Sequence, residues 1–228
     1  PKGEDAEFLI DMMRRSYEIM NEHPVNQKRR EQGLPVANSI WIWGQGKRPN
    51  LVNFEDKYSV KGSVISAIDL IRGIAMYAGL GTVIVEGATG SLDTNYEGKA
   101  QAALNLFDEG NDFVYVHVEG PDESSHAGSL EDKIACIENI DSRIVKPIIE
   151  GLRERGEDFR ILIAPDHRTP LAIRTHSSDP VPFVIYDSRN ELPEDERKQF
   201  NERAAIATGV YVDEAFKLTD ILFEKMKY

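Results

Sequence analysis

The sequence predicts an α/β fold in which helices cover both faces of a mostly parallel sheet. A chain of 228 residues is long enough to bury one sizeable core. From about residue 80 onward, short apolar runs alternate with segments of helical periodicity, and this alternation is typical of a parallel sheet. The segment 129–155 also keeps its isoleucines on a single helical stripe.

The first part of the chain is less regular. Residues 4–22 place apolar side chains at helical spacing after an acidic first turn, which predicts a helix. Residues 23–38 are polar, contain prolines and a glycine and show no periodicity, so we expect a linker or surface loop. The run IWIWG at 40–44 predicts a short strand. Residues 64–79 repeat apolar side chains at helical spacing, which predicts a helix that ends at Gly79.

The remaining elements follow in alternation. Strands are expected at 82–87, 112–120, 159–166 and 180–187. Helices are expected at 96–109, at 129–155 and at the closing segment 219–228. Pro147 lies inside the long helix, where a proline removes a main-chain hydrogen bond, so a kink is expected there.

Composition restricts the possible partners. The formal net charge is −12, so a nucleic acid would have to bind against the field of the whole molecule, and we discount it. No run approaches 18 apolar residues, which predicts no membrane span. The single Cys136 cannot form an internal disulfide, which fits a reducing, cytoplasmic setting. A small phosphorylated substrate stays compatible, because bound divalent cations reverse the local potential.

Metal-ligand side chains follow two of the predicted strands. Asp122 and His126 lie four positions apart after the strand 112–120, while Asp166, His167 and His176 follow the strand 159–166. The carboxyl ends of parallel strands are where open α/β sheets carry their chemistry. Carboxylate oxygen and imidazole nitrogen suit Zn²⁺ or Mn²⁺. Asp166 and His167 are adjacent, so they can share an ion only where the strand has already become a loop.

Simpler interpretations exist for several of these residues. An aspartate after a strand often caps a helix, but Ser129 with Asp132 already supplies a capping pattern for the long helix. His117 alternates with valines inside a strand, where a hydrogen-bonded core histidine is expected. Ser124 and Ser125 stand near His126 as possible nucleophiles, although a histidine that binds metal does not readily act as their base.

Three motifs carry a resemblance to a known family. The segments GPDESSHAG, APDHRTPLAIRTHSSDPVPF and GATGSLDTNYEGKA resemble the cofactor-independent phosphoglycerate mutases of the archaeal-type branch. The resemblance implies the alkaline phosphatase-like fold, two divalent metal ions, with Mn²⁺ ahead of Zn²⁺, Co²⁺ or Mg²⁺, and a phosphoserine intermediate. It extends from about residue 37 to about residue 190.

The resemblance also assigns roles to individual positions. It implies that Asp122, His126 and His176 bind one ion and that Asp166 and His167 supply two ligands of the other. Lys57, in FEDKY, resembles a lysine that binds the substrate phosphate. Arg168 and Arg174 are near enough in sequence to the ligands to help neutralise phosphate.

The sequence departs from the family pattern at its beginning. Family members start with a strand that ends in an aspartate ligand and later carry the nucleophilic serine, and we find neither here. We therefore expect a C-terminal portion, incomplete at its N-terminal side: residues 1–37 as the end of an inserted substrate-clamping domain, and 38–228 as part of the metal-binding domain. Such a fragment is expected to be inactive alone and could self-associate through exposed apolar surface and an unpaired strand edge.

Three functions are compatible with these residues. The resemblance implies a phosphoglycerate mutase that interconverts 3-phosphoglycerate and 2-phosphoglycerate. A metal-dependent phosphatase or phosphonate hydrolase of the same superfamily would use the same ligands. A non-enzymatic metal-binding regulatory domain is the third possibility.

Overall fold

The computed structural model describes residues 1–44, 46–193 and 199–224 and divides the chain into two compact units, Pro1–Pro49 and Asn50–Tyr228. The first unit contains the helices α1 (Ala6–Asn21) and α2 (Pro24–Glu31). Helix α1 agrees with the sequence prediction. That the first unit belongs to an inserted domain stays a prediction.

Two predictions for the first unit are wrong. Residues 24–31 form helix α2 instead of a loop, because His23 caps the helix by accepting a hydrogen bond from the Val25 N–H, and Pro24 has the φ angle that a first helical residue needs. The predicted strand at 40–44 is irregular, with the side chains of Trp41 and Trp43 exposed by 77% and 79%.

The second unit holds a parallel three-stranded sheet in the order β2-β1-β3. Its strands are β1 (Gly62–Ile65), β2 (Gly81–Val83) and β3 (Phe113–Val116). Strand β1 corrects the predicted helix at 64–79: only Asp69–Tyr77 is helical, as α4. All four residues of β1 are buried, and a strand buried on both faces lacks the alternation that distinguishes it from a helix.

Strands β4 (Arg160–Ile163) and β5 (Val184–Asp187) form a separate antiparallel pair. We expected them in one mostly parallel sheet. The segment between them runs out beyond the carboxyl end of β4 and returns, so β5 comes back beside β4 in the opposite direction, as an antiparallel connection allows. The parallel sheet is therefore smaller than predicted.

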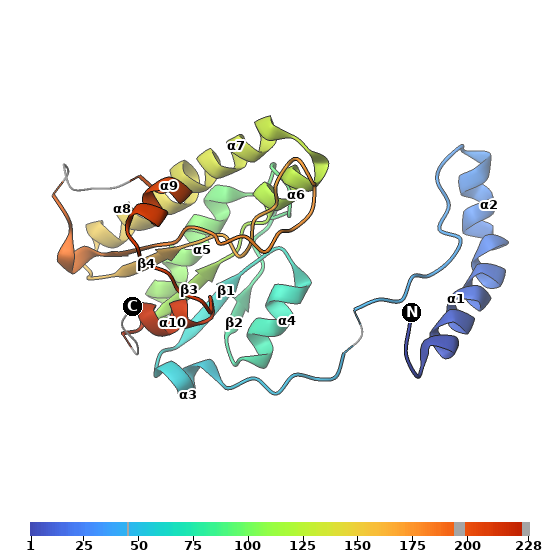
Figure 1. Ribbon diagram of the computed structural model, residues 1–228, viewed down its shortest axis with the longest axis horizontal. Helices are drawn as coiled ribbons and strands as arrows, with labels where there is room; N and C mark the ends of the chain where they lie inside the picture. The colour runs from blue at the N-terminus through green and yellow to red at the C-terminus, as the bar shows by residue number, and fades with distance from the viewer. Residues whose placement is uncertain (45, 194–198, 225–228) are drawn as a thin grey trace. The chain divides into compact units, whose positions relative to one another are not determined.

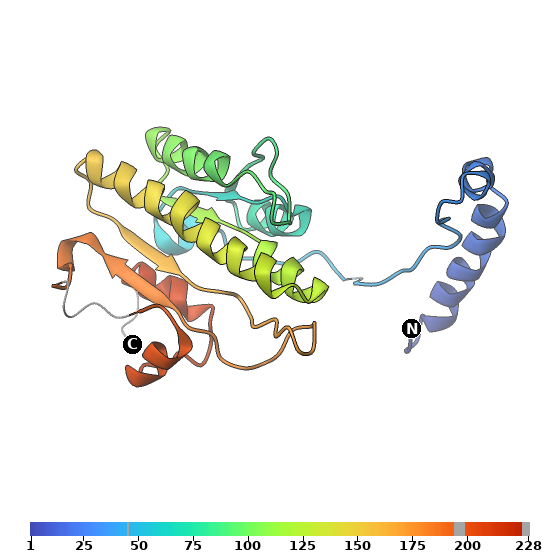
Figure 2. The same cartoon turned by 90° about the horizontal axis from the view of Figure 1, so that it is seen from above.

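Helices surround these strands. The helices and helical turns of the second unit are α3 (Phe54–Tyr58), α4 (Asp69–Tyr77), α5 (Tyr96–Asp108), α6 (Gly120–Ala127), α7 (Leu130–Ile140), the π-helical turn η1 (Asp141–Val145), α8 (Lys146–Glu154), the 3₁₀ turn η2 (Ser188–Asn190), α9 (Glu202–Ala207) and α10 (Lys217–Leu222). The predicted closing helix is found only in part, since residues 225–228 lie outside the described residues. Figure 2 shows α7 and α8 in line as one long helix.

That long helix begins and bends as its sequence indicates. The Ser129 hydroxyl accepts a hydrogen bond from the Asp132 N–H at 3.2 Å, as the capping pattern predicts. The π turn 141–145 lies immediately before Pro147. Because a proline has no N–H and crowds the preceding turn, the regular α-helical bonding is interrupted at this point.

The core of the second unit lies between the sheet, α5 and the long helix. Its most buried members are Ile65, Tyr96, Ala100, Ala103, Leu106, Ile144, Ile148 and Leu152. Full burial of an isoleucine or leucine side chain contributes roughly 1.5–3 kcal/mol. This packing fixes the position of β3 and of the start of α6, which follows it directly.

Asp187 anchors the end of β5. Its carboxylate accepts hydrogen bonds from Arg160 at 2.8 Å and from Arg189 at 2.6 Å, and these bonds, Arg189 first, hold the pKa of Asp187 well below its usual range. Because the pKa of Asp187 is lower in the folded state, its ionised carboxylate stabilises the fold. This contribution is complete above the ordinary pKa of 3.8 and is lost as the pH falls from 3.8 toward the folded-state value.

We therefore expect Asp187→Asn to lower the free energy of unfolding at pH 7 by about 1–2 kcal/mol. The difference from the native chain should narrow as the pH falls below 3.8. Urea unfolding followed by far-ultraviolet circular dichroism at pH 7 and pH 3 measures both quantities. An equal difference at the two pH values would show that the charge of Asp187 is not the cause.

Candidate metal centre

Helix α6 presents two of the predicted ligands on one face. The strand predicted at 112–120 ends at Val116, and Gly120–Ala127 is helical, with Pro121 in its first turn and Gly128 ending it in the left-handed conformation. Residues four apart on a helix are neighbours, so Asp122 and His126 point the same way. Their Oδ2 and Nε2 atoms are 3.2 Å apart.

The segment after β4 brings the other ligands to the same place. Strand β4 ends at Ile163, so Asp166 and His167 lie in irregular chain, as the adjacent pair requires. A β-bridge between Arg168 and Ser177 folds the segment back on itself. This return carries His176 to His167, and the two rings stack with centroids 3.8 Å apart.

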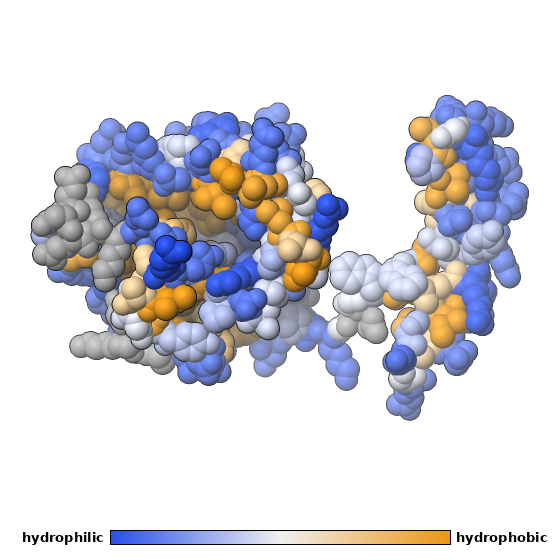
Figure 3. All heavy atoms as spheres, turned by 45° about the horizontal axis from the view of Figure 1, so that its top comes forward, coloured by the Kyte–Doolittle hydropathy of each residue, from blue (hydrophilic) through white to orange (hydrophobic). Residues whose placement is uncertain are grey.

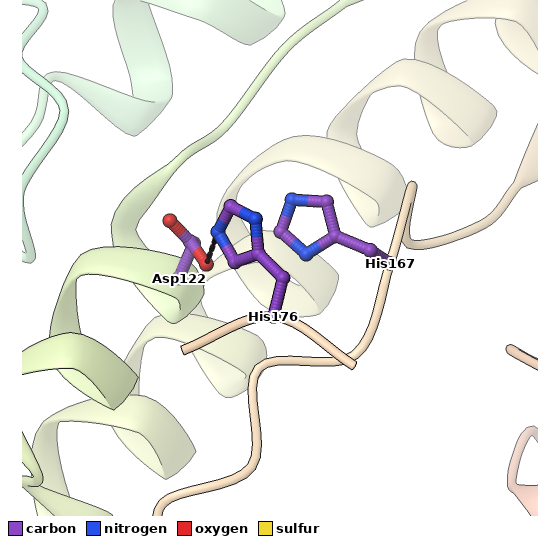
Figure 4. A group of neighbouring side chains, drawn as sticks. All are labelled: Asp122, His167 and His176. Carbon is purple, nitrogen blue, oxygen red and sulfur yellow. Dashed lines mark ion pairs between the residues drawn. The ribbon is translucent and has the colours of Figure 1, made fainter. Parts of the chain in front are cut away.

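The four nearest side chains form a contiguous cluster. His126 Nε2 lies 3.1 Å from His176 Nε2, and His176 Nε2 lies 3.3 Å from Asp122 Oδ1. Asp122, His167 and His176 each offer a ligand atom within 4.8 Å of the others, and Figure 4 shows the two rings beside the carboxylate. Asp166 stands at the rim with its side chain 74% exposed and its Oδ2 3.4 Å from His167 Nε2.

These spacings suit a metal ion. Ligand atoms about 2.0–2.2 Å from an ion and at the tetrahedral angle lie roughly 3.3–3.6 Å from one another. The contacts that link Asp122, His126 and His176 measure 3.1, 3.2 and 3.3 Å. The three side chains are therefore close enough together to be candidates for holding one ion.

A main-chain contact determines which ring nitrogen of His126 carries the proton. Its Nδ1 lies 2.9 Å from the Arg174 carbonyl oxygen, which can only accept, so Nδ1 carries the proton in this contact. In the neutral ring Nε2 is then left with a lone pair directed at the cluster. Arg174 has φ +51, a left-handed conformation uncommon outside glycine, and this places its carbonyl at the histidine.

Thr169 holds the cluster together and was not found by sequence analysis. It is buried, and its hydroxyl donates to Asp122 Oδ1 and lies 3.2 Å from His167 Nδ1. Its own carbonyl accepts a hydrogen bond from the Lys133 ammonium at 3.0 Å, which ties the segment to α7. A threonine after PDHR gives no sequence signal of this role, because the role depends on the helix that faces it.

The surroundings of the cluster are acidic. Burial, followed by repulsion from the Glu123, Asp122 and Asp166 carboxylates, raises the pKa of Glu119. Like charges held together in this way favour occupation by a cation, which relieves the repulsion. His117 is half-buried beside this region, its Nδ1 is 3.3 Å from Ser66 Oγ, and burial lowers its pKa, in agreement with the predicted hydrogen-bonded core histidine.

Two other predicted residues do not join the cluster. The Lys57 ammonium lies 2.8 Å from Asp220 Oδ1, next to Tyr58, and helix α3 packs through Phe54 on Phe113 at the start of β3. The cluster follows the other end of β3, so the geometry does not support a role for Lys57 in phosphate binding. Arg168 donates through Nε to the Pro180 carbonyl at 2.8 Å, beside the cluster in sequence but directed at its own loop.

The serine nucleophile alternative is also disfavoured. Ser124 and Ser125 are both buried, and their hydroxyls donate to the carbonyls of Gly120 and Pro121 within α6. Helical serines with this back-bonding are satisfied internally.

Comparison with known proteins identifies a family for this chain. The family described as the Metalloenzyme superfamily matches residues 11–211. The chain belongs to this superfamily. A probable 2,3-bisphosphoglycerate-independent phosphoglycerate mutase of Geobacter sulfurreducens is 46% identical over 226 residues, which are 99% of this chain and 56% of that protein. A 2,3-bisphosphoglycerate-independent phosphoglycerate mutase of Methanothrix thermoacetophila is 51% identical over 188 residues, or 82% of this chain and 48% of that protein.

The resemblance to phosphoglycerate mutases inferred from the motifs is thus confirmed. The chain spans about half the length of these relatives. A solved structure of a protein from Pyrococcus horikoshii aligns over 98% of this chain and 58% of that one, with a TM-score of 0.76 and 29% identity. A cofactor-independent phosphoglycerate mutase from Thermoplasma acidophilum, at 22% identity, covers 96% of this chain and 51% of that one with a TM-score of 0.56, which shows the fold alone.

The position of Thr169 gives a test of the metal centre. Thr169→Val removes the hydroxyl and should weaken binding of Mn²⁺ or Zn²⁺ about 10- to 100-fold, the usual effect of losing a group that orients a metal ligand. Thr169→Ser keeps the hydroxyl and should bind within about threefold of the native chain. Isothermal titration calorimetry measures both. If the serine and valine variants bind alike, the hydroxyl does not orient Asp122.

Proposed function

We propose that this chain is the metal-binding part of a phosphoglycerate mutase that interconverts 3-phosphoglycerate and 2-phosphoglycerate without bisphosphoglycerate. The observation that carries the proposal is the convergence of Asp122, His126, His167 and His176 at the carboxyl edge of the strands. The names of relatives that are 46–51% identical support the choice of reaction.

The proposal assigns the side chains to two divalent ions, of which Mn²⁺ is the first choice. Asp122, His126 and His176 hold one ion. Asp166 and His167 contribute to the second, which needs further ligands from elsewhere in a protein of full family length. Bound divalent ions of this kind polarise a phosphoryl group and stabilise the attacking and leaving oxygens.

Other residues of this chain orient the metal ligands and help to neutralise a substrate phosphate. Thr169 and the Arg174 carbonyl hold Asp122 and His126 in position. The Arg174 side chain is exposed and lies over Gly128 at the end of α6, where its charge can help neutralise a substrate phosphate. The proposed nucleophilic serine and the groups that grip the glycerate lie outside this chain, so we expect no turnover by the 228 residues alone.

Ligand substitutions test the proposal in a protein of full family length that contains this chain. Asp122→Ala or His126→Ala should lower the conversion of 3-phosphoglycerate more than about 100-fold, a larger loss than for a residue that only orients a ligand. His23→Asn is the matched control: it removes a histidine but keeps the helix cap, so activity should stay within about twofold. Wild-type turnover in either ligand variant would refute the assignment.

The products distinguish the mutase from its nearest alternative. The mutase yields 2-phosphoglycerate, whereas a phosphatase with the same ligands releases inorganic phosphate. Phosphorus nuclear magnetic resonance of the reaction mixture follows both products at once. Stoichiometric release of phosphate would replace the mutase by a hydrolase while leaving the metal ligands as assigned.

A further inference from the structure

His117 follows β3 directly and is held in place by two polar side chains that are almost fully buried. The Lys99 ammonium donates to the His117 carbonyl at 3.0 Å, and the Ser66 hydroxyl lies 3.3 Å from its Nδ1. Lys99 and Ser66 are each only 1% exposed. Burial of a polar group is unfavourable unless it is hydrogen-bonded, so these contacts hold both the main chain and the ring of His117.

The Ser66 contact determines which ring nitrogen of His117 carries the proton. The Ser66 oxygen accepts a hydrogen bond from the Ile68 N–H at 3.0 Å. Among the described residues, His117 Nδ1 is the acceptor within reach of the Ser66 hydroxyl proton. If Nδ1 were protonated, this buried hydroxyl proton would be left without a partner, which is unfavourable. Nδ1 is therefore the acceptor, and in the neutral ring Nε2 carries the proton.

The ring of His117 is neutral at pH 7. Burial, the largest influence, lowers the pKa of His117 below its ordinary value of 6.5, while the Asp166 carboxylate raises this pKa and the Lys99 ammonium lowers it. His117 is thus the reverse of His126, whose Nδ1 donates to a carbonyl and whose Nε2 keeps a lone pair for a metal ion. A protonated Nε2 does not bind a metal ion, but it can donate to an anionic oxygen.

This Nε2 borders a cavity that reaches the candidate metal centre. The cavity has a volume of about 1420 Å³, and its lining includes His117, Asp122, Asp166 and His167. Figure 3 shows apolar surface gathered in a hollow of this unit. The ring is half-buried with Nδ1 at the buried Ser66, so its other edge, with Nε2, is the one left to the cavity. Apolar surroundings strengthen a hydrogen bond to a charged group, because little water competes for it.

We propose that His117 donates a hydrogen bond through Nε2 to a phosphoryl oxygen of the ligand at the metal centre. An imidazole N–H held in one orientation stabilises negative charge on an oxygen without reorganising during the reaction. The inference rests on the proposed function for the identity of the ligand. It assigns to a residue that holds no ion a direct contact with the group that is transferred.

Asp166 is the other anionic group near the ring. Its carboxylate is occupied elsewhere: Oδ1 accepts from the His167 N–H at 3.0 Å, and Oδ2 lies 3.4 Å from His167 Nε2. Within the described part of the chain no hydrogen bond joins Asp166 to the His117 ring. If His117 nevertheless acted by orienting Asp166, its loss would weaken metal binding, as expected for Thr169.

Two substitutions separate the roles of the two ring nitrogens. His117→Asn keeps an amide near the position of Nδ1, beside Ser66, but has no donor at the position of Nε2. His117→Gln places its amide N–H near the position of Nε2. Tyr115→Phe is the matched control, because Tyr115 lies two residues earlier on β3, lines the same cavity and stacks 6.5 Å from the His117 ring. All three are made in a protein of full family length that contains this chain.

Isothermal titration calorimetry measures the binding of Mn²⁺ and then of inorganic phosphate to the Mn²⁺-loaded protein. His117→Asn should weaken phosphate binding about tenfold or more, the usual effect of losing a hydrogen bond to a charged group. Its Mn²⁺ affinity should stay within about threefold of the native value, because no metal ligand loses an orienting group. His117→Gln should recover most of the phosphate affinity, and Tyr115→Phe should bind phosphate within about twofold of the native protein.

A second measurement depends on neither metal nor turnover. Nitrogen-15 nuclear magnetic resonance of the metal-free protein at pH 7 distinguishes the two tautomers of an imidazole ring. His117 should have a protonated Nε2 and an unprotonated Nδ1. In Ser66→Ala, which removes the hydroxyl that donates to Nδ1, the share of the other tautomer should rise.

Three outcomes would overturn the proposal. The first is a protonated Nδ1 in the native protein, and the second is equal phosphate affinity of the native protein and His117→Asn. The third is a loss of Mn²⁺ affinity in His117→Asn, which would assign the ring to orienting Asp166. Release of inorganic phosphate from 3-phosphoglycerate would refute the mutase but not this inference, since a phosphatase also binds a phosphoryl group.

Discussion

The contacts of one carboxylate, that of Asp122, connect parts of the second unit that no shared sheet joins. Asp122 stands on α6, directly after the parallel sheet, and it meets His176 and Thr169 from the segment after β4. Among the described residues β3 and β4 belong to separate sheets, so these contacts and α10 hold the carboxyl and amino ends of the two strands together. The candidate metal centre therefore also connects the two strands structurally.

This joint explains why ligand geometry depends on elements far from the ligands. The core between α5, the sheet and the long helix fixes where α6 begins, and the capping of α7 by Ser129 sets where α6 must end. Lys133 on α7 then holds the Thr169 carbonyl. A change in the packing of the long helix would reach the cluster through this contact, because close-packed interiors transmit displacements.

The clustering of the candidate ligands could be predicted from the sequence more fully than the architecture. That Asp122, His126, His167 and His176 lie together could be predicted, because the segments after two strands carry these residue types in a compact pattern. Their roles as metal ligands stay a prediction. Thr169 could not be predicted, since a hydroxyl becomes important only through the group opposite it. The same limit applies to Lys57, where the motif suggested phosphate but Asp220, 163 positions later in the sequence, supplies the ion-pair partner.

Each error in the predicted fold can be traced to a particular segment. Strand β1 is buried along its whole length, so its apolar run merges with α4 in any periodicity count. Helix α2 has few apolar residues, so its composition predicts a loop, although the Asn26 side chain donates to the Met20 and Ala37 carbonyls and holds the helix against the neighbouring chain. Local composition does not reveal such long-range partners.

No helix among the described residues has the length and apolar character to cross a membrane.

The exposure of Trp41 and Trp43 has a practical consequence for spectroscopy. These are the two tryptophans of the chain, and both lie in the first unit with solvent around them. Intrinsic tryptophan emission should therefore be red-shifted in the native state and should change little when the second unit unfolds. A blue shift on mixing with another polypeptide would report burial of this short segment, independently of events at the histidines.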